Sequence, residues 1–317
     1  MRTLFFGTPE IAVPALEALH ETTTVVGVVC QPDRPAGRGL ELRPPAIKRR
    51  ALELGLDVHQ PRKVKTGNLD EWIRDRDVEV ALVMAYGRII PPKVLAAPRK
   101  GFINLHASLL PRYRGAAPIN WALVRGEQQT GISLMQMDEG CDTGPVYSMH
   151  AIRVEPDETA GTLAERLAAL AAEVVRADLG RALSGELPPV AQDDAEASSA
   201  RIIKKEDGRI DWTKPAQEVH DHARGMTPWP GAFCFVGGKR FKVLSTRRAE
   251  PSGQLGEPGT VLTVGRAGAE VACGSGSLLV LRGQVEGRKA LDASQLAAGR
   301  VLAEGTVLEG VAPAAPA

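Results

Sequence analysis

Two hydrogen-bonding side chains, Asn104 and His106, stand one residue apart at the end of the apolar segment GFINLH. Residues at positions i and i+2 of a strand face the same side, so the amide and the imidazole would point together at the strand's end. An amide beside a cationic imidazole aims two donors at one point, which suits the oxyanion of a tetrahedral acyl-transfer intermediate. Such a pair can be purely structural, but here it is a candidate for acyl or formyl transfer.

Two carboxylates that could join this pair lie further along the chain, in the glycine-flanked segment MDEGCDTGPV. Asp138 and Asp142 follow the strand-like run GISLMQM, and the loop could fold back beside His106. A carboxylate there would favour the imidazolium form and fix the orientation of the ring. No serine or cysteine nucleophile is needed if an incoming amine attacks directly. Cys141 is therefore interpreted as a small spacer, since no separate base is assigned to it.

These side chains need a scaffold that gathers strand ends, and the first half of the chain predicts one. Apolar runs alternate with amphipathic segments; the runs are RTLFF, TTVVGVV, VEVALVMAY and GFINLH. Continuous apolar strands separated by helices predict a parallel sheet covered on both faces, which is a doubly wound, Rossmann-like α/β domain. Ligands of such sheets bind at the carboxyl ends of the strands. Because Gly7-Thr8-Pro9 lacks the G-x-G-x-x-G pattern, no dinucleotide cofactor is indicated.

The second half of the chain has a different residue pattern. Short strand-like runs such as GAFCFV, KRFKVLST and SLLVLRG recur between glycines, which predicts a small β-barrel of the OB type or a sandwich. The polar, proline-bearing segment LSGELPPVAQDDAEASSAR has the composition of a linker. We therefore expect an α/β domain at residues 1–185, a linker at 186–206, a β-barrel domain at 207–305 and a disordered tail at 306–317.

Composition narrows the class of protein. The 317 residues are 44% hydrophobic and 24% charged, as in ordinary globular proteins. The four cysteines form no C-x-x-C pair and no metal-ligand spacing, so we expect free thiols, a reducing compartment and no metal. No signal peptide is recognisable and the apolar runs are too short to cross a bilayer, so we expect a cytosolic protein with no membrane partner.

The order of these motifs resembles the signature of the folate-dependent formyltransferases and formyl-folate hydrolases. The signature runs through Asn104-x-His106, SLLPRYRG and Asp138-x-Gly140-x-Asp142-Thr143-Gly144. The resemblance implies that Asn104, His106 and Asp142 form the catalytic trio and that 10-formyltetrahydrofolate is the formyl donor. It also implies a folate pocket lined by Tyr86, Gly87, Arg88, Ile89, Ile90, Ser108, Leu109, Leu110, Pro111 and Asp138.

Longer phrases resemble one branch of that superfamily, the methionyl-tRNA formyltransferases. These phrases are GTPEIAVPALEAL, CQPDRPAGRGLELRPP, HASLLPRYRGAAPINWAL, KKEDGRIDW and TPWPGA. The resemblance implies transfer of a formyl group to the α-amine of methionyl initiator tRNA, for translation initiation, with tetrahydrofolate as the other product. Two alternatives stay open. One is another enzyme that uses 10-formyltetrahydrofolate, such as a formyl-folate hydrolase or a small-molecule formyltransferase, and the other is a non-catalytic RNA-binding protein with the same fold.

A basic loop after the second strand supports a nucleic-acid substrate. Six cations face a single Glu41 in this stretch: Arg34, Arg38, Arg43, Lys48, Arg49 and Arg50. Four prolines between Pro32 and Pro45 limit the entropy lost when the loop orders, and arginine can stack on an unpaired base or grip phosphate. The resemblance implies that the loop enters the acceptor arm of the tRNA, with contacts from Arg34, Arg38 and Arg43. The alternative is a solvated loop without function.

The second half adds a mild positive charge. Residues 201–317 carry 16 basic against 12 acidic side chains, whereas residues 1–200 carry 23 against 26. The difference is compatible with a polyanion partner and also with ordinary scatter. Since aromatic residues are scarce, we expect salt-dependent phosphate contacts in place of base stacking. The expected contacts are Lys204, Lys205, Arg209, Lys239 and Arg240, and we expect the chain to act as a monomer.

Overall fold

The computed structural model describes the whole chain except residues 37–40, 251, 300 and 312–317. Arg38 and the end of the predicted tail therefore lie outside the described residues. The chain forms two compact units, and the division is not contiguous in sequence. The first unit holds residues 1–118, 129–152 and 164–201, and the second holds 119–128, 153–163 and 202–317. Each unit is described by itself.

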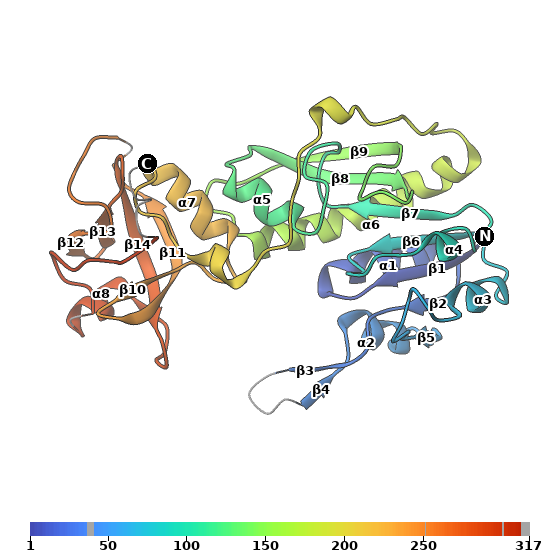
Figure 1. Ribbon diagram of the computed structural model, residues 1–317, viewed down its shortest axis with the longest axis horizontal. Helices are drawn as coiled ribbons and strands as arrows, with labels where there is room; N and C mark the ends of the chain where they lie inside the picture. Colours follow the sequence, from blue (N-terminus) through green and yellow to red (C-terminus); the bar gives the residue numbers. More distant parts are fainter. Residues whose placement is uncertain (37–40, 251, 300, 312–317) are drawn as a thin grey trace. The chain divides into compact units, whose positions relative to one another are not determined.

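The first unit is built on one seven-stranded sheet (Figure 1). Its strands lie in the order β5 (Val58–His59), β2 (Thr24–Val29), β1 (Arg2–Gly7), β6 (Val80–Met84), β7 (Phe102–His106), β8 (Gln129–Gln136) and β9 (Val146–Arg153). The strands from β5 to β7 pair in parallel, and β8 pairs antiparallel with β7. The direction of winding reverses between β1 and β6, which is the point where open α/β sheets bind ligands. The predicted doubly wound α/β architecture is confirmed.

Helices and one hairpin complete this unit. They are η1 (Glu10–Ala12), α1 (Val13–Thr22), α2 (Ala46–Glu53), α3 (Leu69–Arg74), α4 (Pro92–Leu95), α6 (Ala160–Ser184), η2 (Asp194–Glu196) and the hairpin of β3 (Arg34–Ala36) with β4 (Glu41–Arg43). α1 packs against β1 and β2, and α2 packs against β2 and β5. The hairpin lies between β2 and α2 in the chain, where the sequence predicts the basic loop.

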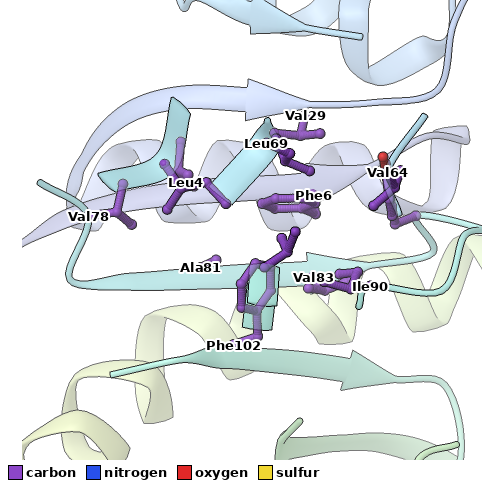
Figure 2. Close-up of a cluster of buried hydrophobic side chains, with 13 residues drawn as sticks. Leu4, Phe6, Val29, Val64, Leu69, Val78, Ala81, Val83, Ile90 and Phe102 are labelled. Carbon is purple, nitrogen blue, oxygen red and sulfur yellow. The ribbon is translucent and has the colours of Figure 1, made fainter. Parts of the chain in front are cut away.

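The alternation of side chains along β1 explains why both faces of the sheet are covered. Leu4 and Phe6 are fully buried on one face, in a cluster that includes Leu69 of α3 and Phe102 of β7 (Figure 2). The rings of Phe6 and Phe102 meet edge to face at 5.0 Å between centroids. Phe5, which must project to the opposite face, is also 0% exposed. A strand buried on both sides reads as a continuous apolar run, as the sequence of this strand does.

The second unit contains an antiparallel sheet and short helices. Its elements are α5 (Pro118–Val124), η3 (Lys205–Gly208), α7 (Ala216–Gly225), β10 (Phe233–Val236), β11 (Lys239–Arg248), β12 (Val261–Gly265), β13 (Gly268–Ala272), β14 (Ser277–Val285), β15 (Leu291–Asp292) and α8 (Ala293–Ala298). The strand order is β10-β11-β14-β13-β12, with β15 beside β14. No ladder joins the edge strands β10 and β12 in the described residues. Isolated bridges from Glu309 to Phe235 and from Val307 to Thr260 lie at these two edges instead, so the prediction of a disordered tail is wrong for residues 306–311. The predicted small β domain is thus an antiparallel sheet without a fully paired barrel.

A buried histidine on α7 links the stability of the second unit to pH. His220 is 2% exposed, its Nε2 lies 3.1 Å from the carbonyl oxygen of Pro156, and its Nδ1 lies 2.9 Å from the hydroxyl of Thr246. A neutral ring with hydrogen on Nε2 satisfies both contacts, since the carbonyl can only accept and the hydroxyl can donate. Burial lowers the pKa of His220 below its ordinary value of 6.5.

We predict that the free energy of unfolding falls as the pH drops below 6.5, the ordinary pKa of histidine. In that range the unfolded chain binds a proton on His220 while the folded chain does not, so protonation favours unfolding. Urea unfolding from about pH 7.5 to about pH 5 should therefore show a shallower loss in His220→Gln than in the parent. Equal slopes for the two proteins would contradict the assignment.

Candidate active site

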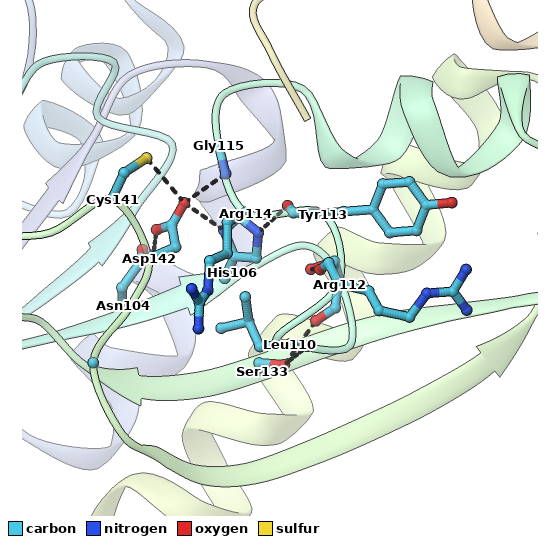
Figure 3. Close-up of polar contacts among 12 residues, drawn as sticks. Asn104, His106, Leu110, Arg112, Tyr113, Arg114, Gly115, Ser133, Cys141 and Asp142 are labelled. Carbon is cyan, nitrogen blue, oxygen red and sulfur yellow. Dashed lines mark hydrogen bonds and ion pairs between the residues drawn. The ribbon is translucent and has the colours of Figure 1, made fainter. Parts of the chain in front are cut away.

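The end of β7 carries the first two predicted catalytic side chains. Asn104 is 8% exposed and His106 is 5% exposed, and all five residues of the strand are buried. β6 pairs with β7 on one side and β8 on the other, so the two side chains leave the sheet at a fixed position. Figure 3 shows both pointing toward the loop that holds Asp142. The predicted strand thus places the amide and the imidazole on one side.

Asp142 brings the predicted trio together. Its Oδ1 accepts a hydrogen bond from Asn104 Nδ2 at 3.3 Å, and its Oδ2 accepts one from the backbone N–H of Gly115 at 2.9 Å. His106 Nδ1 lies 3.6 Å from Oδ2. The carboxylate keeps 17% of its side chain exposed, so the cluster is not sealed from solvent. Asp142 has a φ of 55°, a left-handed conformation that aspartate tolerates better than most residues.

The orientation of the His106 ring is fixed by its two neighbours. Nε2 lies 2.9 Å from the backbone carbonyl oxygen of Tyr113, which can only accept, so Nε2 carries a hydrogen. Nδ1 faces the carboxylate of Asp142, and an imidazolium can donate on both sides. The 3.6 Å separation is longer than a good hydrogen bond. The weak contact with Asp142 leaves an Nδ1–H able to be shared with a substrate oxygen.

Two serines hold the turn that carries the Tyr113 carbonyl. The hydroxyl of Ser108 donates to the carbonyl of Arg112 at 2.7 Å, and the hydroxyl of Ser133 on β8 donates to the carbonyl of Ser108 at 2.7 Å. The N–H of Leu110 donates to Ser133 Oγ at 3.1 Å. Ser108 is 0% exposed, so its hydroxyl supports the turn. In the predicted folate segment 108–111, only Leu109 and Pro111 are partly exposed.

The loop that carries Asp142 is held by hydrogen bonds within the loop and by hydrogen bonds from Gln192. Asp138 Oδ1 accepts from the N–H of Gly140 at 3.0 Å and from the Thr143 hydroxyl at 2.8 Å, so this predicted folate contact shapes the loop. Gln192 Nε2 donates to the carbonyls of Asp142 at 2.8 Å and of Gly144 at 2.7 Å. Sequence reasoning missed Gln192 because it lies in the segment read as a linker. An uncharged amide in such a segment gives no signal that could have found it.

The predicted folate segment after β6 divides into buried side chains and exposed backbone. Tyr86 is 2% exposed and Ile90 is 6% exposed, and both belong to the apolar core. Burial raises the pKa of the Tyr86 phenol to about 12. Arg88 Nη1 donates at 3.0 Å to the carbonyls of residues 61 and 62, while Ile89 is 91% exposed. A ligand at this strand end would therefore meet backbone groups near Gly87 and the side chain of Ile89.

Arg34 and Arg43, the described members of the three arginines expected to contact tRNA, lie on the β3–β4 hairpin. Arg34 and Arg43 are in register, and the residues of β4 are exposed. The guanidinium of Arg34 donates to Gln31 Oε1, so this cation is tied to the root of the hairpin. In the described part of the chain Arg43 makes no side-chain hydrogen bond, whereas one nitrogen of the Arg34 guanidinium is bonded to Gln31 and its other N–H groups remain for a partner.

The predicted tRNA contacts of the second unit gather around β10. Arg209 forms a bridge with Phe233, and Arg240 is in register with Phe235. The guanidinium of Arg240 lies 3.7 Å from the centre of the Phe233 ring, and that of Arg209 lies 5.4 Å from the centre of the Phe235 ring. Three lysines on the flanking segments are exposed: Lys204, Lys205 and Lys239. Three of these cations, Arg209, Lys239 and Arg240, therefore lie beside the edge strand β10.

Neither a metal-binding cluster nor a membrane-spanning helix is found among the described residues. No group of three histidine, cysteine, aspartate or glutamate side chains there is placed to hold a metal ion. His220 and His222 face different partners, since His222 Nε2 donates to the carbonyl of Asp207 at 2.7 Å. Among the described helices, none combines the length and apolar character that a membrane span requires.

Comparison with known proteins identifies both parts of the chain. The formyl transferase family model matches residues 1–179, and the formyl transferase C-terminal domain model matches residues 202–301. A methionyl-tRNA formyltransferase of Sorangium cellulosum is 59% identical over 97% of this chain and 99% of its own length. One from Myxococcus xanthus is 49% identical over 96% of this chain and 97% of its own length.

Solved structures show the same fold at low sequence identity. An N-formyltransferase from Helicobacter canadensis, in complex with folinic acid and dTDP-3-aminofucose, has a TM-score of 0.65 at 16% identity, over 88% of this chain and 98% of its own. A methionyl-tRNA formyltransferase from Clostridium thermocellum has a TM-score of 0.54 at 17% identity, over 78% of this chain and 94% of its own. By the extent of the family match and the identity to its relatives, the chain belongs to the formyl transferase family, in the branch of the methionyl-tRNA formyltransferases.

Proposed function

We propose that this chain transfers the formyl group from N10 of 10-formyltetrahydrofolate to the α-amine of the methionine on initiator tRNA. The observation that carries the proposal is the convergence of Asn104, His106 and Asp142 at the carboxyl end of β7. The name and coverage of the relatives support the same substrate pair. Transfer forms one C–N bond and breaks another, so the amine must lose a proton and N10 must gain one.

Each member of the trio has a role that its contacts suit. Asp142 accepts the proton of the attacking amine, directly or through a water, because its carboxylate is the exposed acceptor of the cluster. Asn104 and the Nδ1–H of His106 stabilise the oxyanion, and a proton returns to N10 as it departs. Holding the amine against the formyl carbon removes bimolecular entropy worth on the order of 7–11 kcal/mol at best.

The folate donor is proposed to bind at the neighbouring strand end. Residues 86–90 follow β6 at the reversal of the sheet, one strand away from His106. Gly87 is exposed and has a φ of 76°, so a flat ring could approach its backbone. The remaining wall would come from residues 108–111 and from Asp138. In this proposal the catalytic domain spans residues 1–185.

The tRNA is proposed to contact both units. Arg34, Arg38 and Arg43 would meet the acceptor arm, and the cations around β10 would meet phosphates. Guanidinium groups that already rest on phenylalanine rings are held in place, so they lose little freedom when they bind phosphate. This assigns residues 207–305 to tRNA binding, whereas residues 186–201 of the expected linker belong to the first unit. The proposed substrates also place the protein in the cytoplasm, where we expect it to act as a monomer.

The test is formylation of charged tRNA by the purified chain with 10-formyltetrahydrofolate. Methionyl initiator tRNA should be formylated, and methionyl elongator tRNA and free methionine should be poor acceptors. Release of formate without any acceptor would indicate a formyl-folate hydrolase. Formylation of an amino sugar nucleotide in place of tRNA would indicate a small-molecule formyltransferase, and either result would overturn the proposal.

Cys141 is predicted to take no part in the chemistry, although its thiol lies 3.8 Å from Asp142 Oδ2. Burial raises the pKa of the thiol, and the neighbouring carboxylate raises it further, so little thiolate exists near neutral pH. We expect Cys141→Ser to keep kcat within about threefold of the parent, a change well under 1 kcal/mol. A loss of a hundredfold or more in single-turnover assays would show that the thiol has a role.

A further inference from the structure

One uncharged side chain, Gln31, bridges the proposed folate segment and the proposed tRNA hairpin. It lies two residues after β2 and is 9% exposed. Its Nε2 donates to the carbonyl of Tyr86 at 3.0 Å and to that of Gly87 at 3.2 Å. Its Oε1 accepts from the guanidinium of Arg34. The carboxamide of Gln31 therefore bonds two different segments: Nε2 bonds the proposed folate segment and Oε1 bonds the hairpin.

The contact with the folate segment depends on the glycine there. A side chain at Gly87 would place its Cβ 2.6 Å from Gln31 Nε2, so the amide would have to move from its present position. The φ of 76° at Gly87 also disfavours other residues. The hydroxyl of Thr8, after β1, donates to the same Tyr86 carbonyl at 2.9 Å. The position of this backbone is thus set jointly by the ends of β1, β2 and β6.

The root of the hairpin is held by a second set of polar contacts. Gln60 Nε2 donates at 2.8 Å to the carbonyl of Gln31 and to Asp33 Oδ1. Lys48 Nζ lies 2.8 Å from Asp33 Oδ2 and donates to Gln60 Oε1 at 2.8 Å. These contacts fix the backbone at residues 31 and 33. The orientation of Arg34 itself is set by Gln31, since its described hydrogen bond goes to that side chain.

We propose that Gln31 is a positioning residue that couples folate binding to tRNA binding, an inference that rests on the proposed function. A folate ring held on the backbone of residues 86–87 fixes the two carbonyls that orient the Gln31 amide. The fixed amide then presents Arg34 in one conformation to the acceptor arm. The first ligand to bind orders the shared element, so the second binds to a site that is already arranged. By linkage, each ligand raises the affinity of the other by the same factor.

Three substitutions test the contacts of Gln31: each removes its contact with the folate segment, its contact with Arg34, or both. Gln31→Leu removes both the donor and the acceptor. Gln31→Glu keeps an acceptor for Arg34 but places a carboxylate against two carbonyl oxygens, so the link to the folate segment is lost. Arg34→Met removes the guanidinium and leaves the amide on Tyr86 and Gly87. All three should therefore abolish the coupling for different reasons.

A matched control is available on the same hairpin. Arg43 is in register with Arg34, and in the described part of the chain it makes no hydrogen bond with Gln31. Arg43→Met removes the same charge from the same surface without touching the bridge. It should weaken tRNA binding equally with and without folate, so its coupling should equal that of the parent.

The experiment measures the dissociation constant of tetrahydrofolate by calorimetry, with and without saturating uncharged initiator tRNA. For the full chain we expect tRNA to tighten folate binding about five- to 150-fold, the usual range of such coupling. The ratio should fall near one in Gln31→Leu, Gln31→Glu and Arg34→Met, and it should be unchanged in Arg43→Met. A ratio near one in the parent, or a parent-like ratio in the Gln31 variants, would overturn the proposal.

The formylation assay keeps this inference separate from the function on which it rests. If the parent formylates initiator tRNA but shows no coupling, only the role of Gln31 fails. If it binds both ligands and forms no formyl-methionyl-tRNA, the proposed function fails. Should Gln31→Leu not fold, Gln31→Glu and Arg34→Met still decide the outcome. In kinetics, the Gln31 variants should raise KM for tRNA at low folate while kcat at saturation of both substrates changes little.

Discussion

Asp142→Asn is expected to lower kcat for formyl transfer by roughly a thousandfold, in the middle of the range for a lost general base. The carboxylate receives N–H groups from Asn104 and Gly115 and faces His106 Nδ1. An amide has one acceptor oxygen, so whichever way it turns, its NH2 group meets another donor. The variant therefore loses the proton acceptor and also disturbs the two donors that serve the oxyanion.

Asn is the least disruptive replacement at this position. Asn tolerates the left-handed φ of 55°, and its size matches the aspartate. We expect an unfolding midpoint close to that of the parent and near-normal tetrahydrofolate binding. Single-turnover formylation then reports the chemical step alone. A turnover within about tenfold of the parent, about 1.4 kcal/mol, would rule out Asp142 as the essential acceptor.

Much of this site could be predicted because it depends on local periodicity. Asn104 and His106 are two residues apart on a strand, and the strand lies where its apolar run places it. The burial of β1 on both faces follows from a run that contains no alternation. Parallel pairing then brings the ends of β6 and β7 to one edge of the sheet. Local pattern and topology were sufficient for the placement of Asn104 and His106, whereas the choice of Asp142 over Asp138 came from the resemblance to the formyltransferases.

The supports of the trio could not be predicted in the same way. The carbonyl of Tyr113 and the N–H of Gly115 are backbone groups, so their residue types say nothing about them. Gln192 reaches Asp142 across fifty positions of sequence, from a segment with the composition of a loop. Gln31 joins two segments through one uncharged amide. Such contacts follow from tertiary geometry, which leaves no periodic signal.

Two side chains of the predicted folate segment belong to the apolar core. The segment after β6 was expected to line a pocket, yet the Tyr86 and Ile90 side chains pack in the apolar cluster. The chain turns at Ala85 and Gly87, which have positive φ and are exposed, while the apolar residues on either side of Gly87 return to the core. Sequence pattern does not distinguish an apolar side chain that covers the core from one that meets a flat ligand.

His106→Gln is expected to reduce kcat roughly a hundred- to a thousandfold, the cost of removing one oxyanion donor. Glutamine can still donate to the carbonyl of Tyr113, which in the parent accepts a hydrogen bond from His106 Nε2 at 2.9 Å. It cannot carry the charge that an imidazolium brings to Nδ1, the atom that faces Asp142 and the substrate. The loss should fall on kcat more than on KM, because the oxyanion exists only in the transition state and the intermediate.

A second histidine–aspartate pair in the same unit provides the matched control. His150 on β9 lies 2.6 Å from Asp178 Oδ2 of α6, and it has no part in the proposed chemistry. His150→Gln removes a similar ring from a similar carboxylate, so it should alter stability but keep kcat within about threefold of the parent. Equal losses of kcat in the two variants would mean that the effect of His106→Gln is not specific to the imidazole beside Asp142. A loss confined to His106→Gln would place the charge of this imidazole in the transition state.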